Sequence, residues 1–253
     1  MPEKNDARNR PHALIDWEAA ERLLHGLSQR LGRELQIAHG DEKGTGIAPF
    51  IGVFASAREE DKAPRLHREF GPTATAIGER IAKAGLSMLS GGCPGIVETA
   101  QDRFVATRIN PRLQHSVGVR ILALEIPEPA NPHLDLEPHA LNFGARLELM
   151  HRFCSGCVVL PGGLGSLLEI AYFLQYSQVA RGGRGMPICL LPGSFWNPLK
   201  DMLARMGAYG TVSPNNGDLS LLHFVDSVDE AMNILLAHNG NAELARAVLA
   251  AAR

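Results

Sequence analysis

The chain has 253 residues, of which 45% are hydrophobic and 21% charged, and its 25 lysines and arginines against 27 aspartates and glutamates give a formal net charge of −2. This composition is typical of a globular protein with a sizeable core, and it excludes intrinsic disorder for most of the chain. The near balance of charge argues against a nucleic-acid-binding surface, which needs a basic excess.

Other features of the composition predict a cytoplasmic protein. No apolar run reaches the ~20 residues of a membrane span. We expect no secretory signal, because residues 1–10 are charged and lead into no apolar segment. Four cysteines are too few for a disulfide scaffold. Cys154 and Cys157 form one CxxC pair without a second pair, so we expect core thiols rather than a metal site.

The first predicted element is an amphipathic helix in an N-terminal extension, residues 1–46. From Asp16, which has the chemistry of an N-cap, apolar residues recur at helical spacing as far as Leu35. Such a stripe needs a surface to cover, and we expect the helix to be an addition to the main domain. A turn-rich stretch at residues 39–46 separates the two.

Strand-like runs then alternate with helical patterns. The predicted strands are 50–55, 86–89, 117–126, 156–160, 187–191 and 223–225. The predicted helices are 65–84, one opened by the loop 90–95, 145–153, one that follows the loop 161–165 and runs to about 178, 197–206 and 228–237. Short apolar strands alternating with helices predict an α/β fold, a Rossmann-like doubly wound parallel sheet with helices on both faces. We therefore predict one domain over residues 47–240 and a C-terminal helical tail over 241–253.

Two glycine-rich loops each follow a predicted strand and open a predicted helix. They are Ser90–Gly95, SGGCPG, and Pro161–Gly165, PGGLG. Glycine lets the backbone approach a ligand, and the free N–H groups in the first turn of a helix favour an anion. Tight strand-to-helix turns also use glycine. Two such loops in one sheet nevertheless favour a phosphate-binding site.

Two other nucleotide-binding motifs are absent from the sequence. No GxxxxGK[ST] occurs, which excludes a Walker-type site, and the second loop lacks the third glycine of a dinucleotide fingerprint. Hydride transfer is therefore unsupported. We expect the bound anion to be a single phosphate group.

The run Pro161–Glu169, PGGLGSLLE, resembles the PGGxGTxxE signature of the LOG family, phosphoribohydrolases often labelled as lysine decarboxylases. Ser166 stands in the place of the usual threonine and keeps its hydroxyl. Arg146, 15 residues before Pro161, matches the position of the family's catalytic arginine. The first glycine loop is also similar, and the resemblance covers about residues 50–236.

Within the family, two segments are closer to the catalytic domain of pyrimidine/purine nucleotide 5'-monophosphate nucleosidases than to the plant cytokinin-activating members. They are Glu128–Pro132, EPANP, and Arg146–Glu148, RLE. The resemblance implies hydrolysis of the N-glycosidic bond of nucleoside 5'-monophosphates, which releases the free base and ribose 5-phosphate.

Glu169 and Arg146 are the catalytic candidates that the resemblance implies. A carboxylate at Glu169 would stabilise an oxocarbenium-like state and hold or deprotonate the attacking water. The guanidinium of Arg146 would grip phosphate or ribose oxygens, or orient Glu169. Each residue also has a structural interpretation. Ser166 and Glu169 have the spacing of a helix capping box, and Arg146 is compatible with a solvated or ion-paired helix residue.

The remaining candidates are ligand-binding residues. Ser56 follows the first strand and Glu125 ends a predicted strand, where ordinary strand-end side chains are also common. The full set of predicted binding residues is Ser56, Gly91, Gly92, Gly95, Glu125, Gly162, Gly163, Leu164, Gly165 and Ser166. We expect no metal, since the one CxxC has no second pair and no histidine pair at zinc spacing, and no cofactor. In particular, no lysine lies in or beside the motifs to form a Schiff base with pyridoxal phosphate.

The expected partners are a nucleoside 5'-monophosphate and, as the resemblance implies, further copies of the chain in a homodimer or larger homo-oligomer. We expect no nucleic acid and no membrane as a partner. An alternative from another class stays open. The same fold and phosphate loops would serve a non-catalytic carrier or sensor of a phospho-ligand, like the molybdenum-cofactor carriers that resemble this family.

Overall fold

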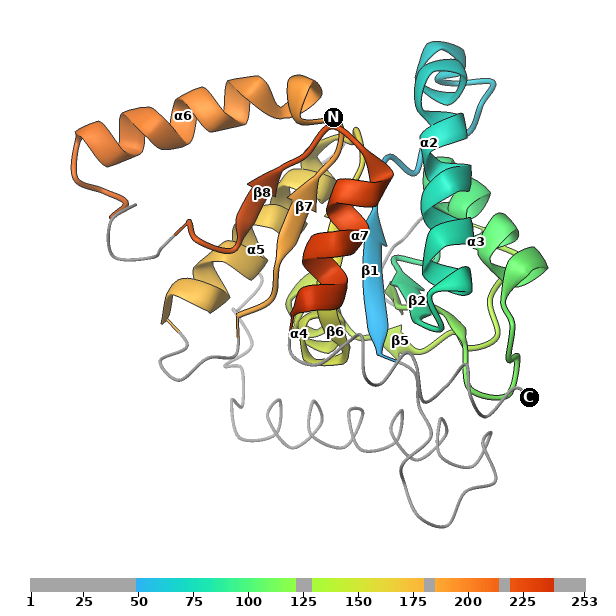
Figure 1. Ribbon diagram of the computed structural model, residues 1–253. Coiled ribbons are helices and arrows are strands. Elements are labelled where there is room, and N and C mark those ends of the chain that lie inside the picture. The colour runs from blue at the N-terminus through green and yellow to red at the C-terminus, as the bar shows by residue number, and fades with distance from the viewer. Residues whose placement is uncertain (1–48, 122–128, 180–184, 214–218, 239–253) are drawn as a thin grey trace, which may run out of the picture.

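The computed structural model describes residues 49–121, 129–179, 185–213 and 219–238 (Figure 1). Its centre is a six-stranded sheet in the order β3-β2-β1-β6-β7-β8, with every neighbouring pair parallel. The strands are β1 (Phe50–Phe54), β2 (Ser87–Ser90), β3 (Ser116–Gly118), β6 (Cys154–Val159), β7 (Ile188–Leu190) and β8 (Leu222–Phe224). Most strand residues are buried, which explains why the strands are continuous apolar runs rather than alternating ones.

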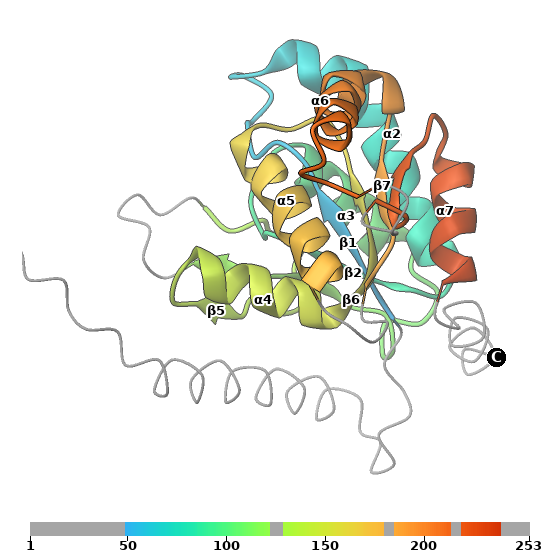
Figure 2. The ribbon, with the colours of Figure 1, turned by 90° about the vertical axis from the view of Figure 1, so that its left-hand side faces the viewer.

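Helices cover both faces of the sheet, as Figure 2 shows from the side. One face carries α2 (Pro64–Lys83), α3 (Ile96–Thr107) and α7 (Val228–Ala237). The other face carries α4 (Phe143–Phe153) and α5 (Leu164–Val179), together with the short helix η1 (Gly193–Trp196) and α6 (Asn197–Ala208). The predicted doubly wound α/β fold is therefore confirmed.

The helices form where local chemistry favours them. Pro64 lies in the first turn of α2, where its missing N–H costs nothing. Ile77 and Ile81 of that helix are fully buried against the sheet. Gly78 allows α2 and α3 to pack closely, because an added Cβ would lie 2.0 Å from the backbone oxygen of Ala100. This contact fixes α3, whose N-terminus follows the first glycine loop.

One predicted strand is wrong in part. The run 117–126 is not a single strand, because β3 ends at Gly118 and β4 (Arg120–Ile121) pairs with β5 (His139–Ala140) in a separate two-stranded sheet. The N–H of Val119 still bonds to Ser90 O, whereas the N–H of Arg120 bonds to Pro138 O. The chain thus leaves the edge of β2 at this point. The other predicted strands and helices from residue 50 to 237 agree with the structure to within about two residues at most ends, a difference usual for element boundaries.

Several predictions fall on residues that the structure does not describe. These are the helix from Asp16 to Leu35, the end of the run 117–126 and the tail after residue 241. The expectation of core thiols at Cys154 and Cys157 is confirmed, since both are free and buried, and burial raises the pKa of each. Cys189 is free and buried in the same way. In the described ranges no helix is long and apolar enough to cross a membrane. The same ranges hold no cluster of three metal-ligating side chains.

Candidate active site

The candidate site lies where the strand order reverses. From β1 the chain builds β2 and β3 on one side, and it then returns to place β6 on the other side of β1. In open parallel sheets, ligands bind at the carboxyl ends of the strands at such a point. The loops that leave β1 and β6 contact each other there, because the N–H of Ser56 donates to Pro161 O at 3.3 Å.

The first glycine loop joins this junction through Ser56. The N–H of Ile96, the first residue of α3, donates to Ser56 O at 3.2 Å. Gly95 has a φ of +92°, and an added Cβ would lie 2.7 Å from the same Ser56 oxygen. Only glycine satisfies both the backbone conformation and the close contact. Three loops, those after β1, β2 and β6, therefore meet at one place.

Arg146 lies in the first turn of α4 and is held against the first glycine loop. Asn142 caps this helix, since its side chain accepts a hydrogen bond from Ala145 N at 2.9 Å. The Arg146 guanidinium donates from Nε to Val119 O at 2.8 Å and from Nη2 to Gly91 O at 3.0 Å. It forms no ion pair with the carboxylates of the described residues. Arg146 is half-buried, and two of its guanidinium nitrogens are bonded to backbone carbonyl groups rather than to solvent.

The second glycine loop opens α5, but not as a capping box. Gly163 is the cap, because its carbonyl accepts the N–H of Leu167 at 3.1 Å and the helix begins at Leu164. Ser166 is therefore the third residue of the helix. Its buried hydroxyl has no hydrogen-bond partner within the described residues. An added Cβ on Gly162 would lie 2.0 Å from this oxygen, so the hydroxyl lies directly against the loop.

Glu169 lies in the second turn of α5, whereas a capping box of Ser166 and Glu169 would place it in the first turn. Its side chain is buried, with 8% of the residue exposed, and no described residue donates a hydrogen bond to the carboxylate. Burial raises the pKa of Glu169 to about 7, although the nearby guanidinium of Arg146 acts in the opposite direction. A buried carboxyl group with a strongly shifted pKa and one charged neighbour is typical of a functional site.

The space in front of α5 is open. Gly163, Leu164 and Gly165 are exposed, and an added Cβ on either glycine would meet no atom of the described residues within 4 Å. The N–H groups in the first turn of a helix have no intrahelical acceptors. This end of α5 therefore offers several donors to an anion. Glu125, the remaining predicted binding residue, lies outside the described residues.

A contact that the sequence did not reveal joins the two helices of the site. Tyr172 on α5 donates from its hydroxyl to Glu148 Oε2 on α4 at 2.7 Å. It thereby ties the helix of Arg146 to the helix of Glu169. The two residues are 24 positions apart, and no local pattern relates them.

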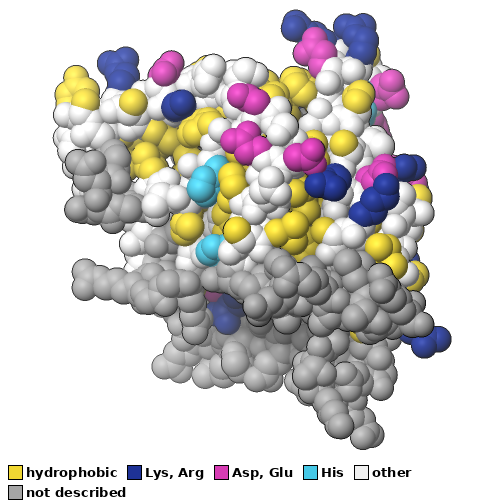
Figure 3. Space-filling model, viewed as in Figure 1, with side chains coloured by type: hydrophobic (Ala, Val, Ile, Leu, Met, Phe, Trp, Pro, Cys, Tyr) yellow, Lys and Arg dark blue, Asp and Glu magenta, His cyan; other side chains and the backbone are white. Residues whose placement is uncertain are grey.

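One cavity lies away from these residues. It has a volume of about 610 Å³ and runs along α6, where Pro198, Met202, Met206 and Tyr209 line it. Figure 3 shows apolar side chains gathered in this region. The lining includes no predicted site residue, so we do not assign the proposed chemistry to it.

Comparison with known proteins agrees with this fold. The sequence model of a family described as "Possible lysine decarboxylase" matches residues 103–235, more than half of the chain. A search of curated protein sequences found no match. A similar solved structure is that of TM1055, a structural genomics target, with a TM-score of 0.55 and 19% sequence identity over 75% of this chain and 99% of that one.

Two further structures are of proteins that handle the molybdenum cofactor. The molybdenum cofactor carrier protein of Chlamydomonas reinhardtii has a TM-score of 0.51 and 21% identity over 75% of this chain and 99% of its own. The molybdenum cofactor binding protein of Rippkaea orientalis has a TM-score of 0.50 and 17% identity over 75% of this chain and 96% of its own. At such identities the comparison establishes a shared fold alone.

Proposed function

The chain belongs to the LOG family, and from that premise we propose that it hydrolyses the N-glycosidic bond of nucleoside 5'-monophosphates. The products are the free base and ribose 5-phosphate. The observation that carries the proposal is the buried Glu169 carboxyl group, with a pKa of about 7 and the Arg146 guanidinium nearby. Glu169 lies in the second turn of α5, and the N-terminus of this helix is exposed.

In the proposed reaction, Glu169 acts as an ionised carboxylate. Loss of the base from C1' leaves positive charge on the ribose ring, and a carboxylate in a desolvated site stabilises that charge. The attacking water gives its proton to Glu169 as its oxygen bonds to C1'. The leaving base takes a proton from solvent. A pKa near 7 suits a group that must accept a proton at neutral pH.

The 5'-phosphate is proposed to bind at the first turn of α5. The backbone N–H groups there, the helix dipole and the unpartnered hydroxyl of Ser166 are all suited to phosphate oxygens. Arg146, fixed by two carbonyl groups, would add a permanent positive charge on the side of the first glycine loop. Lysine decarboxylation, which the family's description names, finds no support in these residues. Neither glycine loop, nor α4 or α5, contains a lysine that could bind pyridoxal phosphate.

The experiment that tests the proposal is incubation of the purified protein with AMP, GMP, CMP and UMP, followed by chromatography of the released base. Adenosine is the matched control for AMP, since it differs only in lacking the phosphate. We expect turnover of at least one nucleotide and none of adenosine. Equal turnover of AMP and adenosine would contradict the role given to the α5 N-terminus.

A carrier function is the second candidate, because it is consistent with the fold that this chain shares with the two molybdenum-cofactor proteins. A carrier would need the phosphate-binding loops but not an ionisable Glu169. Nucleotide or pterin-phosphate binding without any turnover, and with unchanged affinity in Glu169→Gln, would favour the carrier over the hydrolase.

We also propose that the chain forms a homodimer or a larger homo-oligomer. Helix α5 leaves Leu164, Leu168 and Val179 exposed, an apolar surface that a second copy would cover. Light scattering should give at least a dimer at micromolar concentration, and Leu168→Glu should weaken it. The matched control is Met202→Glu on α6, because Met202 is 48% exposed and Leu168 is 43% exposed. A monomeric wild type would contradict this proposal.

A further inference from the structure

A closed ring of buried hydrogen bonds holds Gly92 in the first glycine loop. The N–H of Gly92 donates to Ser90 Oγ at 2.9 Å, and Ser90 Oγ donates to Gln101 Oε1 at 2.9 Å. Asn131 Nδ2 donates to the same Gln101 oxygen at 2.7 Å, and the backbone N–H of Asn131 donates to Gly92 O at 3.1 Å. The ring thus joins the end of β2, the middle of α3 and the segment that precedes β5.

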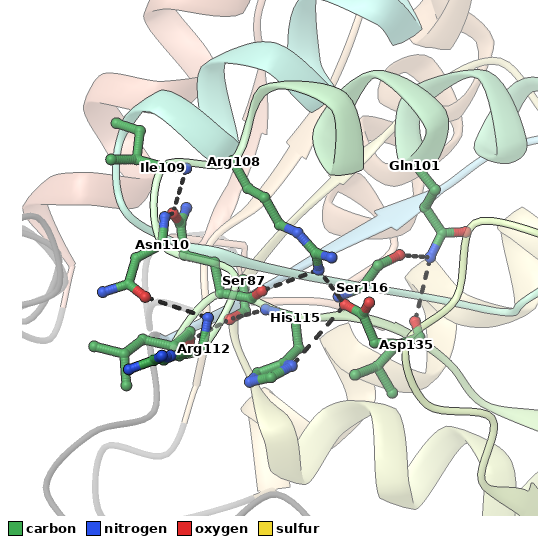
Figure 4. A network of polar contacts seen from close by, with 12 residues as sticks. Ser87, Gln101, Arg108, Ile109, Asn110, Arg112, His115, Ser116 and Asp135 are labelled. Atoms are coloured by element: carbon green, nitrogen blue, oxygen red, sulfur yellow. Dashed lines mark hydrogen bonds and ion pairs between the residues drawn. The ribbon is translucent and has the colours of Figure 1, made fainter. Parts of the chain in front are cut away.

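The ring is fixed to the sheet by Gln101. Its Nε2 donates to Ser116 Oγ at 3.0 Å and to Val117 O at 3.4 Å on β3, and Figure 4 shows it reaching Ser116. The side chains of Ser90, Gln101 and Asn131 are almost completely buried. A buried polar group without a partner costs about 1–3 kcal/mol, so a ring in which all members are paired strongly favours one geometry.

The same peptides that the ring holds also hold Arg146. Gly91 O, next to Gly92, accepts the hydrogen bond from Arg146 Nη2 at 3.0 Å. Val119 O accepts the bond from Arg146 Nε at 2.8 Å, and the N–H of Val119 donates to Ser90 O at 2.9 Å. Gly91 O therefore belongs to the same peptide group as the N–H that donates to Ser90 Oγ, and Val119 O belongs to the residue whose N–H donates to Ser90 O.

We propose that Ser90, Gln101 and Asn131 are positioning residues, which hold the Gly91–Gly92 peptide and, through it, the guanidinium of Arg146 in place for the reaction. The inference rests on the proposed function for its catalytic consequence. Gly92 has a φ of +68°, and a pair of glycines has no side chains to fix its own conformation. The ring restricts the backbone in their place. A misplacement of about 1 Å at a catalytic group is enough to lower the rate ~100-fold.

Ser87 supplies a matched control for Ser90. Both residues lie on β2, both are fully buried, and each hydroxyl accepts one backbone N–H and donates one hydrogen bond. Ser87 bonds to Leu113 O and His115 N at the opposite end of the strand. Ser87→Ala and Ser90→Ala should therefore destabilise the fold to a similar extent, and only Ser90→Ala should disturb the loop.

The test measures two properties of each variant. Amide hydrogen exchange of the peptide that contains residues 91–93 should be at least ~10-fold faster in Ser90→Ala than in the wild type and unchanged in Ser87→Ala. With AMP as substrate, kcat should fall at least ~10-fold in Ser90→Ala with KM changed less than ~3-fold, while Ser87→Ala stays within ~2-fold of the wild type. In an Arg146→Lys background, the loss of kcat from Ser90→Ala should largely disappear, since the two residues act through one contact.

Equal effects of the two serine substitutions on exchange or on kcat would overturn the proposal, and so would faster exchange with unchanged kcat. If the wild type turns over no nucleotide, the proposed function fails, and the exchange comparison still decides whether the ring holds the loop. Should Ser90→Ala not fold, Asn131→Asp replaces it. This variant keeps the backbone bond to Gly92 and the acceptor for His133 N, but removes the donor to Gln101.

Discussion

Glu169→Gln should stabilise the folded protein at neutral and higher pH while it abolishes activity. In the folded state, burial raises the pKa of Glu169 from an ordinary 4.5 to about 7. A rise of this size corresponds to about 3 kcal/mol, because each pKa unit is worth about 1.4 kcal/mol. Only 8% of the Glu169 residue is exposed, so solvent screening reduces this figure little.

The sign follows from which state binds the proton more tightly. The folded state has the higher pKa, so the stability that the neutral carboxyl group contributes is fully present below about pH 4.5 and is lost as the pH rises to about 7. Glutamine does not titrate. The stability of the variant minus that of the wild type should therefore increase by up to about 3 kcal/mol between these pH values and stay constant above them.

The assay is chemical denaturation of both proteins at several values between about pH 4.5 and pH 8. Comparing the difference at each pH removes any constant cost of burying the glutamine amide. In Glu169→Gln, kcat for AMP should be at least ~100-fold lower than in the wild type at neutral pH. A gain in stability together with a loss of turnover is the signature of a carboxyl group kept for function.

Glu148→Gln is the matched control, because this carboxyl group lies on the neighbouring helix and shifts the other way. Burial acts to raise the pKa of Glu148, but hydrogen bonds from Tyr172 and Arg152 outweigh it and hold the pKa below its ordinary value. Its contribution to stability is therefore present above about pH 4.5 and lost as the pH falls further. A difference for Glu169→Gln that does not change with pH, or that falls as the pH rises, would refute the reasoning.

Three further substitutions test the geometry of the site. An added Cβ on Gly163 would meet no atom of the described residues within 4 Å, so Gly163→Ala should lower the free energy of unfolding by no more than about 1 kcal/mol, the cost of alanine at a helix cap. It should raise KM for AMP at least ~10-fold, and an unchanged KM would argue against phosphate at this loop. Arg146→Lys keeps the charge but loses the hydrogen bond from Nε to Val119 O, so kcat should fall at least ~10-fold, and wild-type turnover would show that the planar fork is not needed. Tyr172→Phe removes the hydrogen bond to Glu148 that joins α4 and α5. Urea denaturation should show that the free energy of unfolding falls by about 1 kcal/mol. An unchanged free energy of unfolding would mean that packing alone joins the two helices.

The sequence was sufficient for features that depend on neighbouring residues. Buried parallel strands are short apolar runs, and the helices between them follow their own periodicity, so the alternation predicted the doubly wound sheet. The two glycine loops were found because each follows a strand directly. Arg146 and Glu169 were found only through the family signature, since one arginine and one glutamate carry no local pattern of their own.

Contacts between distant segments decided the features that no local sequence pattern could predict. The sequence left open whether Glu169 caps a helix, and the start of α5 at Leu164 excluded this by moving Ser166 inside the helix. The pKa of Glu169 depends on how deeply α5 buries the carboxyl group, which is a property of packing. The run 117–126 was expected to be a single strand. The chain leaves the sheet after Gly118 because the N–H of Arg120 donates to Pro138 O and β4 pairs with β5. No local periodicity predicts this pairing of distant residues.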